Sequence, residues 1–295
     1  MGEIDPGLKA HVQGGLTTLS HAWSITRKDG VVLGFTDHDR DLEFDGIVFR
    51  ADTGLSGLAL AQSTGLSVDN SEAIGALSDL AIREDEIEQG RFDEADVRAW
   101  LVNWQDTNQR WLQFRGTIGE LTRANGGFQA ELRGLTEALN RPLGRVFQKP
   151  CTAVLGDASC RFDLTTPGYS VEVEVDQVTD RRILTWSSFS AFETDWFARG
   201  RVEVLDGPAA GLWGTVKHDR IIGDGRVIEL WEPLRAELFQ GAMLRISAGC
   251  DKRSSTCRLK FGNLSNFRGF PDLPGDDWMI AVPKSSGANT GGSLR

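Results

Sequence analysis

The chain has 295 residues, 40% of them hydrophobic and 25% charged, a composition typical of a globular protein long enough for two domains. Its formal net charge of −10 argues against a protein whose main task is to grip a nucleic-acid backbone. We see neither a secretory signal nor a segment apolar enough to span a membrane. We therefore expect folding in a reducing cytoplasm, where thiolates bind metals more readily than they form lasting disulfides.

The first half of the chain is predicted to consist mainly of β-hairpins. Alternating apolar residues predict strands that meet at Asp29-Gly30, Asp45-Gly46 and Asn125-Gly126 turns. The predicted strands cover residues 18–26, 31–36, 41–44, 47–50, 95–104, 109–118, 120–123 and 128–133. Short helices are predicted over 5–12, 78–89 and 135–141, with strand and loop over 53–78.

A second set of strands is predicted between two widely separated groups of cysteines. These strands cover residues 169–176, 182–186, 201–205, 212–221 and 226–231. Their number and spacing predict a small barrel-like β unit inserted into the chain. The sequence thus predicts a mainly β protein of β-barrel or β-sandwich domains with a few short helices. Its predicted parts are a β domain (1–145), a cysteine-bearing region (146–168 and 246–282), the inserted β-barrel-like domain (169–245) and a flexible tail (283–295).

The four cysteines form two pairs, Cys151 with Cys160 and Cys250 with Cys257. Four interpretations compete: two disulfides, a structural zinc site, an iron–sulfur cluster, or four buried thiols without a ligand. Zinc knuckles usually separate their cysteines by two to four residues, whereas the gaps here are eight and six. An iron–sulfur cluster is larger than one ion and accepts thiolates from longer loops. Lys149, Lys252, Arg253 and Arg258 could offset its negative charge.

The residues around these cysteines resemble a known family. Lys149-Pro150-Cys151 and Gly156-Asp157 in the first segment, and Lys260-Phe261-Gly262-Asn263 and Asn266-Phe267-Arg268-Gly269-Phe270-Pro271 after the second, are similar to tail-tip hub proteins of long-tailed phages and gene transfer agents. That family includes the lambda tail-tip protein, which carries a [4Fe–4S] cluster. The phrase from Gly34 to Leu42 and the stretch from Gly90 to Trp104 resemble the gene-transfer-agent branch. The resemblance covers nearly the whole chain.

The resemblance implies a structural baseplate hub rather than an enzyme. It assigns the ligands of a [4Fe–4S] cluster to Cys151, Cys160, Cys250 and Cys257, with zinc as the alternative. It also implies a homotrimer that joins a distal tail ring to a central host-contact protein, near a cell-wall peptidase. The expected location is the tail of a virion-like particle assembled in the host cytoplasm, without direct nucleic-acid binding or a membrane segment.

Other residues support different functions more weakly. A redox or sensor role would use the same cluster, but no flavin or nicotinamide motif accompanies it. A cell-wall hydrolase would use His38 as a base with Asp37 or Asp39, although no nucleophile or second histidine completes a motif. We expect this loop to be solvated or to dock on a neighbouring subunit. Trp100, Trp104 and Trp111 could stack on a ligand but are more commonly core residues, and His218-Asp219 is predicted to be structural.

Overall fold

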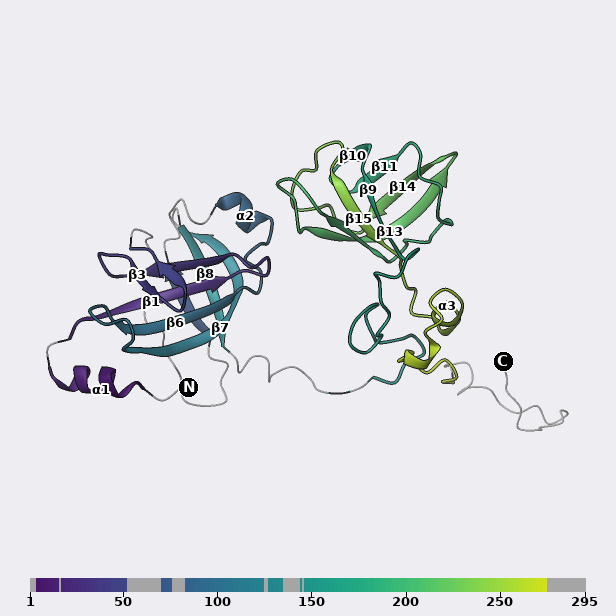
Figure 1. Ribbon diagram of the computed structural model, residues 1–295. Coiled ribbons are helices and arrows are strands. Elements are labelled where there is room, and N and C mark those ends of the chain that lie inside the picture. The colour runs from purple at the N-terminus through teal and green to yellow at the C-terminus, as the bar shows by residue number, and fades with distance from the viewer. Residues whose placement is uncertain are drawn as a thin grey trace. The chain divides into compact units, whose positions relative to one another are not determined.

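The protein is described here by a computed structural model covering residues 4–15, 17–51, 70–75, 83–124, 127–134, 144 and 146–274 (Figure 1). The chain divides into two compact units, Met1–Leu143 and Gly144–Arg295. The helix predicted over 135–141 and the tail 283–295 lie outside the described residues, as do most of residues 53–78. Among the described residues, no helix is both long and apolar enough to cross a membrane.

The first unit contains a six-stranded antiparallel sheet, in the order β2-β1-β6-β7-β8-β5 (Figure 1). One strand, β7, replaces the two predicted over 109–118 and 120–123; its pairing with β8 shifts register between Ile118 and Leu121. The strands are β1 (Leu19–Thr26), β2 (Val32–Thr36), β5 (Asn70–Gly75), β6 (Asp96–Asn103), β7 (Arg110–Ala124) and β8 (Gly127–Gly134). Helix α1 (Pro6–Gln13) begins after the capping carboxylate of Asp5, and α2 (Glu84–Glu88) is shorter than predicted.

Strands β1 and β6 are buried on both faces. Trp23 and Val97 belong to a core cluster on one face, whereas Trp100 faces the other. There the small hairpin of β3 (Leu42–Phe44) and β4 (Ile47–Phe49) covers the sheet, and the Phe44 and Phe49 rings stack 4.1 Å apart with their edges toward Trp100. The core interpretation of Trp100 is therefore confirmed.

The second unit contains a seven-stranded antiparallel sheet that curls around one core of sixteen buried side chains. Figure 1 shows this barrel-like body in green, and the strand order is β10-β11-β14-β13-β12-β15-β9. The strands are β9 (Ser170–Glu174), β10 (Gln177–Thr179), β11 (Ile183–Trp186), β12 (Arg201–Val204), β13 (Trp213–Ile222), β14 (Gly225–Leu230) and β15 (Met243–Ser247). The predicted mainly β fold with few short helices is confirmed, although the sequence analysis missed β10 and β15.

Strands β9 and β15, the first and last strands of this sheet along the chain, pair with each other. Ser170 at the start of β9 lies opposite Ser247 at the end of β15. The Ala248 amide extends this contact by donating to the Tyr169 carbonyl at 2.7 Å. The segments that lead into and out of the barrel therefore start side by side, although they are far apart in the sequence.

A fully buried ion pair lies inside the barrel. Asp219 and Arg226 have no exposed side-chain surface, and the Arg226 Nε and Asp219 Oδ1 atoms lie 3.4 Å apart. Asp219 Oδ2 accepts a hydrogen bond from the Phe197 amide at 2.8 Å, and Arg226 Nη2 donates to the Glu193 carbonyl at 2.9 Å. Burial raises the pKa of Asp219 and lowers that of Arg226. The pair therefore holds the loop that contains residues 193–197 against the barrel, in line with the structural role predicted for Asp219.

Substituting Asp219→Asn should destabilise the protein strongly, because it leaves the buried Arg226 guanidinium without its counter-charge. We expect a loss of about 3–5 kcal/mol in the free energy of unfolding measured in urea. The control is Glu172→Gln, which breaks an exposed 2.8 Å pair with Arg245 and should cost less than about 1 kcal/mol. Equal losses in the two variants would contradict a special role for the buried pair.

Candidate metal centre

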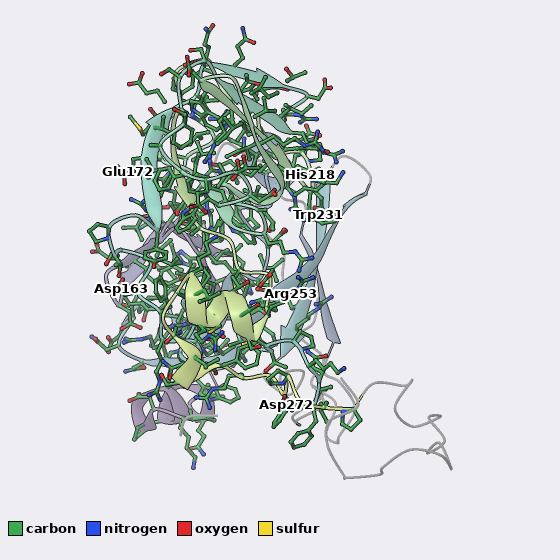
Figure 2. All side chains as sticks on the ribbon, turned by 90° about the vertical axis from the view of Figure 1, so that its right-hand side faces the viewer. Asp163, Glu172, His218, Trp231, Arg253 and Asp272 are labelled. Carbon is green, nitrogen blue, oxygen red and sulfur yellow. The ribbon has the colours of Figure 1, made fainter. Side chains whose placement is uncertain are left out.

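The four cysteines line one cavity in the second unit. None of them is in a disulfide, and each is half-buried. The cavity is small, with a volume of ≈ 20 Å³. Figure 2 shows this part of the chain below the barrel, around α3 (Ser254–Leu259), with Asp163, Arg253 and Asp272 labelled. Its lining residues are Cys151, Ala153, Leu155, Cys160, Cys250, Lys252, Arg253, Cys257, Phe261, Asn263, Asn266 and Phe267.

Asp157 shapes the loop between the first two cysteines. Its carboxylate accepts hydrogen bonds from the amides of Cys160 (2.6 Å), Val154 (2.9 Å) and Ser159 (2.9 Å). These backbone hydrogen bonds, led by that of Cys160, lower the pKa of Asp157. Gly156 adopts a φ of +84° in the same turn, a conformation that favours glycine. Gly156 and Asp157 therefore explain why the chain turns sharply enough to bring Cys160 back toward Cys151.

The second pair extends from the last strand of the barrel. Gly249 precedes Cys250 and lies so close to the loop at Ala198 that an added Cβ would be 1.7 Å from the Ala198 carbonyl oxygen. The ammonium of Lys260 donates to the carbonyls of Gly249 and Trp196 and lies over the Trp196 ring. Cys250 is thus held by the same loop that the buried ion pair holds from inside the barrel. Cys257 lies on the helix α3.

Hydrogen bonds join the two cysteine pairs directly. The Cys151 amide donates to the Lys252 carbonyl at 2.8 Å. The Lys252 ammonium donates to the Ala153 carbonyl. The Arg268 amide lies 3.3 Å from the Cys151 sulfur as a donor, and the side-chain amide of Asn263 lies 3.5 Å from the Cys160 sulfur. Each cysteine of the first pair therefore receives an N–H group from the segment that follows Cys257.

The electrostatics of the cavity disfavour several thiolates together. Burial raises the pKa of Cys250. Burial also raises the pKa of Cys257 to about 11, with further contributions from charge on the other three cysteines. Cysteine side chains bind metal as deprotonated thiolates, so metal binding at this site would release protons.

The donor set fits a thiophilic metal group, since thiolate sulfur suits zinc and iron–sulfur clusters. The nearby N–H groups and the ammonium groups of Lys252 and Lys260 fit a site with excess negative charge. Within the described part of the chain, no group of three or more His, Cys, Asp or Glu side chains is arranged to hold a single ion. The four sulfurs share the cavity without forming such a group.

The histidine loop of the first unit makes local contacts. His38 Nδ1 accepts a hydrogen bond from the Arg40 amide at 3.0 Å and lies 3.1 Å from Asp39 Oδ1, while its ring packs on Trp104 at 4.9 Å. Asp37 pairs with a different histidine, His21, at 2.9 Å. The residues proposed for a hydrolase therefore belong to two separate pairs. Trp104 is 37% exposed, so the core interpretation does not hold for it.

The comparisons with known proteins agree with the resemblance to tail hub proteins of phages and gene transfer agents. The family described as "Baseplate hub protein, N-terminal attachment domain" matches residues 5–163, more than half of the chain. The chain belongs to this family. A second family, "Phage conserved hypothetical protein BR0599", matches residues 195–277. This hub protein is also similar to a chain of the solved structure "Virion of native gene transfer agent (GTA) particle", with 54% identity and a TM-score of 0.91 over 99% of this chain and 100% of that chain. No curated protein matches it.

The sequence analysis named all four cysteines of the cavity but missed the residues that position them. Lys260, Asn263 and Arg268 stood inside the motif that carried the family resemblance, yet their roles became apparent only from their contacts. The spacing of the cysteines gave no sign of which residue would donate to which sulfur.

Gly269→Ala should open the cysteine cavity. An added Cβ at this position would lie 2.5 Å from the Lys149 carbonyl oxygen and 2.7 Å from the Pro150 backbone, so one of the two segments must shift. We expect faster alkylation of the four cysteines by iodoacetamide than in the parent protein. Gly144→Ala is the matched control, because its Cβ meets nothing within 4 Å. Equal alkylation rates in all three proteins would show that this close approach does not hold the cavity together.

His21 should titrate above its ordinary pKa of 6.5, because its side chain is hydrogen-bonded to Asp37. The stabilisation from this pair is then fully present below pH 6.5 and is lost as the pH rises through the pKa of the folded state. In an NMR titration, Asp37→Asn should lower the pKa of His21, whereas Asp39→Asn should leave it unchanged. An unchanged His21 pKa in Asp37→Asn would refute the assigned pairing.

Proposed function

We propose that this chain is the trimeric hub of a phage-like tail baseplate, where it joins the distal tail ring to the central host-contact protein. The support is its membership of the baseplate hub family and its 54% identity, over 99% of its length, to a chain from a gene transfer agent virion. The role is structural, and a tail cell-wall peptidase is a further neighbour in this proposal.

Oligomeric state is the direct test of the assembly proposal. Native mass spectrometry of the purified protein should show a trimer. Mixing it with the distal tail protein should give a larger complex in which the trimer is retained. A protein that stays monomeric both alone and with the distal tail protein would rule the trimeric adaptor out.

We further propose that Cys151, Cys160, Cys250 and Cys257 hold a [4Fe–4S] cluster, with zinc as the alternative. The observation that carries this proposal is that four half-buried thiols, from segments about 90 residues apart, line a single cavity. The cluster would supply a metal–sulfur cross-link between the two segments. The chain's own residues turn the two loops toward each other and place N–H groups near the sulfurs.

The cross-link would act locally because the barrel closes the long intervening loop by itself. Ser170 and Ser247 are paired, so each cysteine pair belongs to a short segment that starts from the same edge of the barrel. The entropic cost of closing a loop grows with its length, and here β9–β15 pairing meets most of that cost. The binding energy, on the order of 10 kcal/mol by analogy with structural zinc, would then further stabilise residues 146–168 and 248–274, which hydrogen bonds already hold together, rather than the barrel.

Anaerobically purified protein should contain iron and acid-labile sulfide in equal amounts and absorb broadly in the visible range. Cys257→Ser should lose most of both, because it removes one of four ligands. Ser255→Ala, on the exposed side of the same helix, is the matched control and should keep them.

Hydrogen exchange should show that Cys257→Ser lowers, without abolishing, the protection of residues 146–168 and 248–274 relative to the metal-loaded parent protein, while strands β13 and β14 stay fully protected. Zinc in place of iron and sulfide would select the alternative metal. The absence of any bound metal in protected material would refute the metal site altogether.

A further inference from the structure

The segment after the last cysteine lies along the first cysteine loop and contacts it repeatedly. The Phe270 amide donates to the Gln148 carbonyl at 2.9 Å. Arg268 presents its amide to the Cys151 sulfur, and its carbonyl accepts a hydrogen bond from the Thr152 hydroxyl at 3.3 Å. The close approach of Gly269 to the Lys149 carbonyl belongs to the same contact. Residues 263–270 therefore form the wall that joins the two cysteine pairs.

Asn263 is the residue of this segment that contacts a cysteine of each pair. Its side-chain Nδ2 donates to the Cys160 carbonyl at 2.7 Å and lies 3.5 Å from the Cys160 sulfur. Its backbone amide donates to the Cys257 carbonyl at 2.9 Å, and its own carbonyl accepts from the Cys257 thiol at 3.3 Å. Four contacts of one residue thus fix two cysteines that are distant in sequence.

A second asparagine fixes the orientation of the Asn263 amide. Asn266 Nδ2 donates to Asn263 Oδ1 at 2.7 Å, and the Asn266 amide donates to the Asn263 carbonyl at 3.0 Å. Because Oδ1 accepts from Asn266, the NH₂ group of Asn263 must point toward Cys160. An N–H donor then faces the sulfur, whereas an aspartate at this position would place a negative charge there.

We propose that Asn263 is a positioning residue that sets Cys160 and Cys257 relative to each other before any metal group binds. This inference rests on the proposed metal site, because it concerns the readiness of that site for its ligand. Ligands held in place by surrounding hydrogen bonds lose less freedom on binding, and loss of such support typically weakens metal binding by about tenfold to a hundredfold.

The test compares Asn263→Asp and Asn263→Ala with the parent protein and with Asn108→Asp. Asn108 lies in the first unit, where it bonds to Asp106, so this control makes the same chemical change away from the cysteines. Each full-length protein is stripped of metal, reconstituted with iron and sulfide, and exposed to a chelator. Both Asn263 variants should lose iron about tenfold or more faster than the parent protein and Asn108→Asp, with Asn263→Asp the fastest.

Hydrogen exchange of the metal-free proteins provides a reading that does not depend on the cluster. In the parent protein, peptides covering 148–160 and 250–264 should already be protected, because the Cys151 amide is bonded across the cavity to Lys252 and the Asn263 amide is bonded to Cys257. Asn263→Ala should lose this protection while peptides from β13 and β14 keep theirs, which shows that the barrel is folded.

The outcomes separate this inference from the metal proposal. Protection that depends on Asn263 in a protein that binds no iron would support the positioning role and refute the cluster. Iron binding with no effect of Asn263 on its loss rate would refute the positioning role and leave the cluster standing. Metal-free parent protein without protection in these peptides would also overturn it, since the metal would then organise the cavity.

Discussion

Hydrogen bonds between segments about 100 residues apart hold the cysteine-bearing part of this protein together. The Cys151 amide reaches the Lys252 carbonyl, the Asn263 side chain reaches Cys160, and the Arg268 amide reaches the Cys151 sulfur. These contacts hold four thiols around one cavity.

The barrel supports this arrangement from behind. Its buried Asp219–Arg226 pair holds the loop around residues 192–197, and that loop in turn contacts Gly249 and Lys260. A charge pair without solvent contact is an expensive way to stabilise a core, because both ions lose their hydration. The pair instead fixes one conformation of the loop, because the Asp219 carboxylate and the Arg226 guanidinium both bond to the loop's backbone. The barrel thereby fixes the direction in which Cys250 leaves β15.

Sequence patterns predicted the strands well where alternation was long. Strands β1, β6, β13 and β14 were predicted close to their observed bounds. Strand β10 is only three residues long, too short for periodicity to reveal, whereas β15 alternates in burial and was overlooked. Helix α3 carries Ser and Thr in its first turn, residues that favour caps and loops, and tertiary packing overrides that preference. The membership of four cysteines in one cavity followed from resemblance to a family, whereas the roles of Asn263 and Asp219 depend on contacts across the fold that no local pattern encodes.

The pairing of β9 with β15 also makes the barrel a unit that another domain could replace. Since Ser170 and Ser247 lie opposite each other, the chain leaves and returns at neighbouring points. A module bounded in this way can be exchanged for another of different size while the flanking segments keep their spacing. Grafting a foreign β domain between these two serines would therefore be geometrically feasible. The grafted domain would also need a backbone carbonyl to which Gly249 and Lys260 can donate hydrogen bonds, as they now donate to Trp196.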